Sequence, residues 1–170
     1  MLAAAQELFS EAGRDVSREA VARRAGVGIG TVYRHFPTHD ALVEAAYRNE
    51  VAQLCGAADD LLRDHPPDVA LAKWMDRFVG YYATTRGMSN ALQSAVGSGS
   101  DVFADARAPI VGALATILDA GVAAGTVRAD VGAEDVLGAM GALWLIRDDA
   151  AQARRVLMLV MDGLRPRAAG

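Results

Sequence analysis

The chain contains a single cysteine, Cys55, so no disulfide can form within it. Aromatic residues make up only 6% of its 170 residues, although 52% are hydrophobic, so the apolar residues are mostly alanine, valine and leucine. No uninterrupted apolar run of about 20 residues occurs, which predicts that no helix spans a membrane. No stretch alternates apolar and polar residues as a half-buried strand does. Because alanine, leucine, arginine and methionine are strong helix formers, these features predict an all-α protein.

Two further absences bear on location and activity. Met1 is followed at once by helix-forming residues with no basic leader, so we expect no signal peptide and a cytoplasmic protein. No serine, histidine and aspartate set lies at a strand end or sharp turn, and Cys55 lies within an ordinary predicted helix, which argues against nucleophilic catalysis. We therefore expect no enzyme activity, no cofactor and no bound metal.

Positive charge is scarce over the whole chain, which has a formal net charge of −4. This balance argues against a protein that coats nucleic acid along its length. Residues 14–39 are the exception, because they hold five arginines against two acids, a local formal charge of +3, together with His35 and His39. The distribution predicts a small basic face on an acidic body.

Helix boundaries follow from capping and breaking residues. Ser17 is a good N-cap, Pro37 must end the helix before it, and Asp68 is expected to cap a helix that Arg86-Gly87 ends. Residues 97–100 are expected to form a flexible loop. The predicted helices run from residue 2 to a stop at Gly13, then over 18–25, 28–36, 39–63, 68–85 and 88–96, through Pro109 to 123, and over 133–146 and 150–164.

Residues 26–42 carry the most informative pattern in the chain. They follow a short amphipathic helix after a turn at Gly26, and two short helices joined by such a turn are typical of a helix-turn-helix that enters the DNA major groove. Val32 and Phe36 are four residues apart and would face the core, which leaves the neighbouring polar side chains outside. In that arrangement Arg34 would contact guanine, and Tyr33 would donate to a phosphate.

The predicted DNA-contacting residues extend from the first of these helices to the start of the next. An ordinary solvated helix surface is the alternative interpretation, and for Ser17 a role as a cap alone is equally compatible with its position. His35 and His39 have a metal-ligand spacing, but Pro37 lies between them and no third ligand is near. The full set is Ser17, Arg18, Gly28, Thr31, Tyr33, Arg34, His35, Thr38 and His39.

The order of these motifs resembles that of the TetR family of one-component bacterial repressors, over about residues 2–48. The residues that carry the likeness are Ala4-Ala5, Leu8-Phe9 and Gly13, then 21–27 (Val-Ala-Arg-Arg-Ala-Gly-Val), 30–36 (Gly-Thr-Val-Tyr-Arg-His-Phe) and Asp40-Ala41-Leu42. The resemblance implies that residues 30–36 form the recognition helix. The family usually has a basic arm before the first helix, and a lysine where this chain has His39.

The resemblance also implies a two-part organisation, with a three-helix DNA-binding head at residues 1–45 and a ligand-binding and dimerisation domain at 46–170. The expected protein is a homodimeric repressor that a small apolar or amphipathic molecule releases from a palindromic DNA operator. The alternative is a helical ligand-binding or interaction module that has lost DNA binding.

Two sets of residues in the second part are candidate sites, although a buried core within one chain is the alternative for both. Aromatic and methionine side chains suit an apolar effector pocket; the predicted lining is Trp74, Phe78, Tyr81, Tyr82, Met88, Leu92, Phe103, Leu114, Met140 and Trp144. The last two helices have wide apolar faces and small residues, which suit a four-helix dimer interface; the predicted contacts are Leu137, Gly141, Trp144, Val156, Leu157, Val160 and Leu164.

Overall fold

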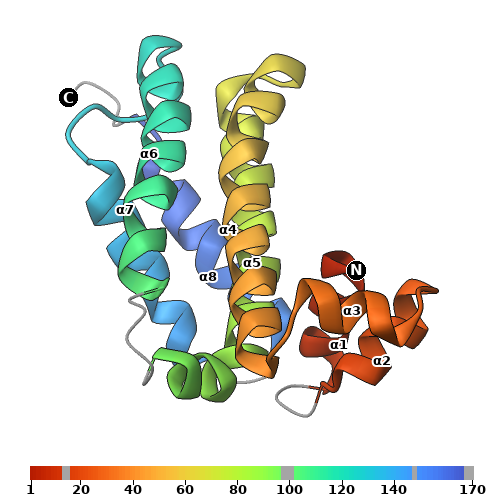
Figure 1. The fold of residues 1–170 in the computed structure, drawn as a ribbon. Helices are drawn as coiled ribbons and strands as arrows, with labels where there is room; N and C mark the ends of the chain where they lie inside the picture. The colour runs from red at the N-terminus through yellow and green to blue at the C-terminus, as the bar shows by residue number, and fades with distance from the viewer. Residues whose placement is uncertain (13–15, 97–101, 147–148, 167–170) are drawn as a thin grey trace. The chain divides into compact units, whose positions relative to one another are not determined.

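The computed structural model describes residues 1–12, 16–96, 102–146 and 149–166. Within these ranges the chain is helical and contains no strand, which confirms the all-α prediction. The elements in Figure 1 are α1 (Leu2–Ala12), α2 (Arg18–Ala25), α3 (Ile29–His35), α4 (His39–Asp64), α5 (Pro67–Val96), α6 (Val102–Ala123), α7 (Ala133–Met140), the 3-10 helix η1 (Gly141–Leu145) and α8 (Ala150–Leu164).

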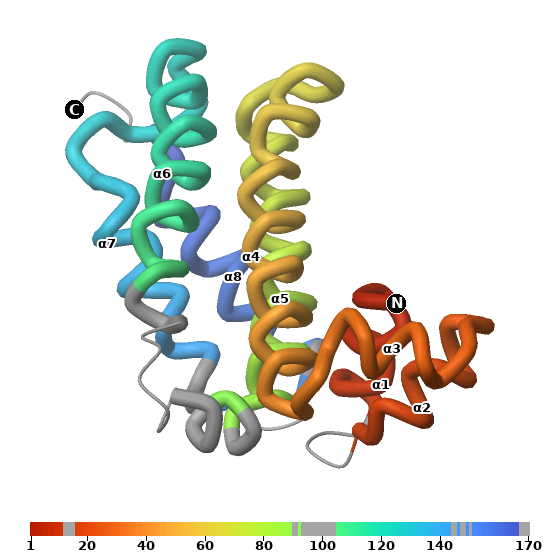
Figure 2. The backbone as a smooth tube through the Cα atoms, viewed as in Figure 1, coloured from red at the N-terminus to blue at the C-terminus, as the bar shows by residue number. Residues whose placement is uncertain are grey.

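The chain divides into two compact units. The first comprises residues 1–52 and 81–106, and the second comprises 53–80 and 107–170. The long helices α4 and α5 each contribute a segment to both units, and in the tube of Figure 2 the two helices run side by side. The first unit therefore contains α1 to α3 and parts of α4, α5 and α6.

Local signals define the short helices at the start of the first unit. The Ser17 hydroxyl accepts a hydrogen bond from the Ala20 N–H at 3.1 Å and so caps α2. Gly26 then adopts φ 66°, a left-handed conformation that favours glycine, and ends α2. Pro37 follows α3 and lacks an N–H for a further helical turn. The predicted cap at Ser17 and the predicted boundaries of α2 are thus confirmed.

Apolar side chains from every helix of this region meet in its core. Phe9 of α1, Val21 of α2 and Val32 of α3 are completely buried, and Phe36 is 9% exposed. Apolar side chains spaced along α4 are also buried, from Leu42 to Leu61. Burial of a large aliphatic or aromatic side chain stabilises a fold by about 1.5–3 kcal/mol.

The predicted break at Arg86-Gly87 is wrong, because α5 continues without interruption to Val96. Glycine in a helix costs about 1 kcal/mol relative to alanine. The fully buried Met88 and Leu92 lie on the next turns, and their burial outweighs that cost. The predicted cap at Asp68 is also wrong, since α5 already begins at Pro67, a residue well suited to the first position of a helix.

The penultimate helix is shorter than predicted. The α-helix α7 ends at Met140, and residues 141–145 form the tighter η1. Gly138 and Gly141 lower the helix propensity of this stretch. A 3-10 turn commonly replaces the last turn of a helix whose propensity is low. The final helix α8 has the predicted bounds.

The core of the second unit is built around Trp74 of α5. Its indole N–H donates to the Leu54 carbonyl at 2.9 Å, and its ring stacks on Phe78 with centroids 5.8 Å apart. Leu114 and Ile117 of α6 and Met140 of α7 are completely buried in the same unit. The segment of α6 from residue 105 to residue 123 is long and apolar enough to cross a membrane. The core helices of soluble proteins meet the same criterion, so the expected absence of a membrane-spanning helix stays a prediction.

A close contact joins α6 to the loop that follows it. A Cβ at Gly121 would overlap Cγ2 of the buried Val127, whereas a Cβ at Gly112 on the same helix would meet no atom within 4 Å. The loop then reaches α8, because the Arg128 N–H donates to the Leu164 carbonyl. Gly121 therefore permits the loop to pack on α6.

We expect Gly121→Ala to lower the free energy of unfolding by about 1–3 kcal/mol, because the new methyl group overlaps Val127. Gly112→Ala is the matched control, and it should raise the same free energy by about 0.5–1 kcal/mol through helix propensity. Urea denaturation followed by circular dichroism measures both changes. Equal stability of the two variants would contradict the contact.

Candidate nucleic-acid interface

The recognition helix predicted from the sequence is α3, a seven-residue helix between Gly28 and Phe36. Its Val32 is buried against the rest of the head, and α2 packs directly on α3. Gly28 is the N-cap residue, and it offers no side chain to the exposed amide groups of the first turn. The buried face of α3 therefore determines which side chains remain outside.

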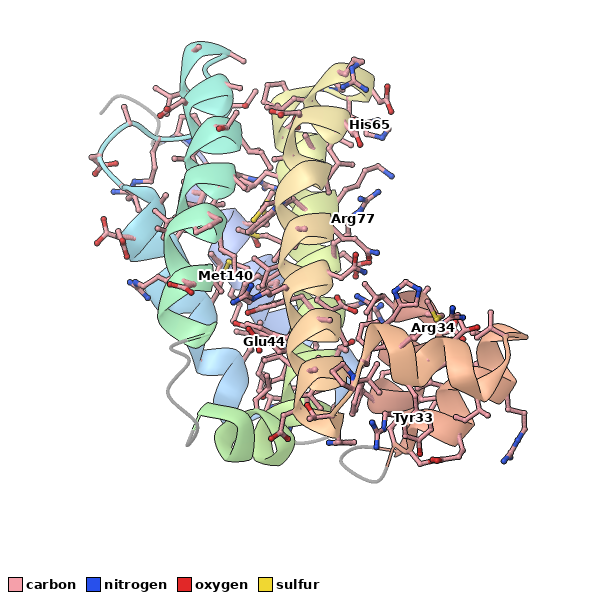
Figure 3. All side chains as sticks on the ribbon, in the orientation of Figure 1. Tyr33, Arg34, Glu44, His65, Arg77 and Met140 are labelled. Carbon is pink, nitrogen blue, oxygen red and sulfur yellow. The ribbon has the colours of Figure 1, made fainter. Side chains whose placement is uncertain are left out.

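The outward face of α3 carries polar groups. Tyr33 is 41% exposed, Arg34 and His35 are exposed, and Thr31 is half-buried. Figure 3 shows Tyr33 and Arg34 projecting from the head in different directions, as expected of consecutive helical residues. Ile29 at the start of the helix is also 41% exposed, a candidate for contact with a thymine methyl group that the sequence prediction missed.

Arg18 does not extend into solvent. Its Nη1 donates to the carbonyl oxygens of Pro37 at 2.5 Å and Phe36 at 3.2 Å, just after the end of α3. Its guanidinium carbon lies 4.0 Å from the ring centroid of Tyr33, a cation–π contact. Arg18 thus joins the first turn of α2 to the end of α3. Its predicted contact with a phosphate stays a prediction.

The hydroxyl of Tyr33 donates a hydrogen bond of 2.5 Å to Oε1 of Glu19. This bond lowers the pKa of the Glu19 carboxyl, chiefly because the phenol donates to the ionised form. The same bond raises the pKa of the Tyr33 phenol, since a nearby carboxylate opposes formation of the phenolate. The sequence prediction named Tyr33 but missed Glu19, which lies fourteen residues earlier.

The residues that open α4 divide between capping and packing. The Thr38 hydroxyl accepts from the Ala41 N–H at 3.0 Å and so caps the helix. The Nε2 atom of His39 lies 3.1 Å from the Val16 carbonyl, and the imidazole meets Phe9 edge to face. His39 therefore contacts the head's own chain, and its predicted contact with DNA stays a prediction.

Two arginines of the head, Arg23 and Arg34, have no partner among the described residues. Both are exposed, and Arg34 lies on the outward face of α3. Arg24, by contrast, forms ion pairs with Glu7 at 3.1 Å and Glu11 at 2.9 Å. A guanidinium without a partner on an exposed helix can donate in parallel to a guanine edge or a phosphate.

Both parts of the chain match families of known regulators. Residues 1–46 match the family of bacterial regulatory proteins, tetR family, and residues 66–166 match the C-terminal domain of SbtR-like transcriptional regulators. The solved structure of a TetR transcriptional regulator from Streptomyces coelicolor is 50% identical and has a TM-score of 0.91, with 98% of this chain and 97% of that chain covered. The chain belongs to the TetR family.

A second solved structure supports this assignment, and a third shares the fold. A TetR regulatory protein from Mycobacterium vanbaalenii is 36% identical, with a TM-score of 0.78 over 97% of this chain and 92% of that one. FadR from Bacillus subtilis, solved with stearoyl-CoA, is 18% identical and shares the fold, with a TM-score of 0.58 over 96% of this chain and 97% of that one. This TetR-family protein is a transcriptional regulator with a DNA-binding helix-turn-helix, and its family is not enzymatic.

The residues predicted to line an effector pocket lie in both units of the TetR-family chain. Tyr82, Met88 and Leu92 are buried in the first unit, where Tyr81 is half-buried, and Trp74, Phe78, Leu114 and Met140 are buried in the second. The side chains of Phe103 and Trp144 lie outside the described residues. Their role as a pocket lining stays a prediction.

Polar groups interrupt the apolar core of the first unit. The hydroxyls of Tyr47 and Tyr81 lie 3.1 Å apart, and burial raises the pKa of the Tyr47 phenol far above its usual value. Thr85 is 1% exposed, and its Oγ1 has no hydrogen-bond partner among the described residues. A buried hydroxyl without a partner costs free energy unless a ligand or water satisfies it.

Two hollows lie at the surface of the units, and none of the predicted pocket residues lines either. A groove of about 1190 Å³ in the second unit has Asp64, His65 and Arg77 along it, together with Met161 of α8. A smaller hollow of about 280 Å³ in the first unit is lined by Tyr47, Arg48, Val51, Asp105 and Ala106.

The predicted dimer contacts differ in their exposure. Leu157 and Leu164 are buried within their own chain, at 4% and 5% exposure, and their contact with a second copy stays a prediction. Val156 and Val160 are half-buried, as is Leu137 of α7, while Gly141 is exposed. The large apolar side chains that α8 exposes are Met158 at 64% and Leu159 at 71%, both of which the sequence prediction omitted.

We expect Ser17→Ala to lower the free energy of unfolding by about 1 kcal/mol, because the first turn of α2 loses its cap. Ser17→Asp is the matched control, since a carboxylate accepts the same hydrogen bond and should retain most of the stability. Urea denaturation measures both variants. If the aspartate variant loses as much stability as the alanine variant, the hydroxyl does not act as a cap.

Proposed function

We propose that this protein is a homodimeric repressor that a small apolar or amphipathic molecule releases from a palindromic operator. The observation that carries the DNA-reading part is the exposed, unpaired Arg34 on the outward face of a recognition helix whose other face is buried. Thr31 and His35 flank it on the same short helix. One bidentate contact from arginine to guanine discriminates by about 1–3 kcal/mol.

A dimer would supply the second recognition helix. Two-fold symmetric proteins place two such helices in major grooves about 34 Å apart, which is why their operators are palindromic. The exposed Met158 and Leu159 on α8, with half-buried Val156 and Val160 beside them, support an interface through this helix. Exposed side chains of this size, clustered on one helix, are typical of a protein contact.

Release by a ligand requires that the ligand bind better to a state with low DNA affinity. The helix α4 begins at His39, four residues after the end of α3, and continues for 26 residues without a break, so it belongs to both units. A shift of α4 would therefore move the residues that follow α3. FadR, which shares the fold, was solved with the amphipathic molecule stearoyl-CoA, and the apolar core residues of this chain suit an effector of similar character.

Arg34→Ala should weaken operator binding about tenfold or more, because it removes a direct base contact. Fluorescence anisotropy with tiled duplexes from upstream of the protein's own coding sequence measures this change. Arg77→Ala is the matched control, because it removes the same charge from the second unit and should bind like wild type. If Arg34→Ala and Tyr33→Ala both bind like wild type, α3 does not contact the DNA bases. If the wild-type chain binds none of the duplexes, the result favours a module without DNA binding.

Leu159→Glu should convert the dimer to a monomer, because a charge would then lie within an apolar interface. Sedimentation velocity at micromolar concentration measures the mass of the particle. Val122→Glu is the control, since Val122 is an exposed apolar residue of α6, at 37% exposure, and its replacement should leave a dimer. A Leu159→Glu variant that remains dimeric would show that α8 does not form the interface.

A further inference from the structure

An acidic side chain lies directly beside the recognition helix. Glu19 is exposed in the first turn of α2, and its Oε1 accepts the Tyr33 hydroxyl at 2.5 Å. The pKa of the carboxyl is lowered, chiefly because the phenol and the backbone of Glu19 donate to its ionised form, and the Arg18 charge adds to the effect. The face predicted to approach DNA phosphates thus carries a fixed negative charge.

The phenol of Tyr33 can satisfy only one acceptor with its proton. A tyrosine hydroxyl has a single O–H donor, and both a carboxylate and a DNA phosphate oxygen act as acceptors toward it. The ring itself is held in place, because Arg18 lies 4.0 Å over its centroid and is tied to the carbonyls of Phe36 and Pro37. The hydroxyl must therefore leave Glu19 in order to donate to a phosphate.

We propose that Glu19 limits the DNA affinity of the head, because its carboxylate accepts the hydrogen bond that the Tyr33 hydroxyl would otherwise donate to a DNA phosphate. This inference rests on the proposed function, in which Tyr33 donates to the DNA backbone. Glu19 also adds like-charge repulsion toward the phosphates. A limited affinity suits a regulator that a ligand must release, because coupling between two sites commonly changes affinity by only about 5- to 150-fold.

The test separates competition for the phenol proton from simple charge removal. Glu19→Gln is compared in the wild-type and Tyr33→Phe backgrounds, with a duplex of random sequence at low salt and with the operator duplex as probes. We expect Glu19→Gln to bind DNA about fivefold more tightly than the wild-type protein. In the Tyr33→Phe background, we expect the same substitution to tighten binding by at most about twofold. Glu7→Gln is the matched control, because it removes the same charge from α1, where the carboxylate pairs with Arg24.

A second measurement follows the hydrogen bond without DNA. The difference between the ultraviolet pH titrations of each protein and its Tyr33→Phe counterpart isolates this phenol. The carboxylate disfavours the phenolate, so Glu19→Gln should lower the pKa of Tyr33, and an unchanged pKa would overturn the pairing. The titration could also confirm the hydrogen bond while Glu19→Gln raises DNA affinity equally in the wild-type and Tyr33→Phe backgrounds. That result would overturn the proposal that Glu19 and phosphate compete for the Tyr33 hydroxyl.

Two results would separate the failure of this inference from that of the proposed function. If the wild-type protein binds the operator and Glu19→Gln binds more weakly, Glu19 supports binding, and only the present inference is overturned. If the wild-type protein binds neither duplex, the proposed function fails and this inference fails with it.

Discussion

The recognition helix of this protein depends on burial, because it is too short to hold itself together. An isolated helix of fewer than about 12–15 residues is marginal in water, and α3 has seven. Its conformation is maintained by Val32 and Phe36, which are buried in the head, and by Arg18, whose guanidinium satisfies carbonyl groups beyond its last turn. The outward direction of Arg34 and Tyr33 follows from that buried face.

The same arrangement divides the positive charges of the head between structure and recognition. Arg18 is held at the end of α3, and Arg24 is paired with two glutamates of α1. Arg23 and Arg34 remain available to a partner. This explains how a chain of net charge −4 can bind DNA through a few local contacts without a basic surface along its length.

The sequence predicts those parts of the fold that are specified by neighbouring residues. Ser17, Gly26 and Pro37 act through their own backbone or an adjacent turn, so the bounds of α2 could be read directly and the end of α3 to within one residue. The break expected at Arg86-Gly87 is wrong, because the cost of one glycine is small beside the burial of residues that follow it. Helix propensity describes single residues, so it does not include the free energy gained when distant parts of the chain bury these side chains.

The contacts between helices could not be predicted in the same way. The bond from Tyr33 to Glu19 and the bonds from Arg18 to the end of α3 depend on how α2 crosses α3. Similarly, the apolar pattern of α8 does not reveal that Leu157 is covered by its own chain while Leu159 is exposed. A periodic apolar pattern identifies a helix that buries side chains, but not the partner that covers each of them.

The most direct test of this account is an amide nitrogen–proton NMR titration of the protein with its operator duplex. We expect the largest shifts at residues 28–35 and at the first turn of α2, and we expect them to saturate at two subunits per duplex. Binding that leaves the amide shifts of α3 unchanged would contradict the claim that this short helix, with one face buried in the head, contacts the DNA.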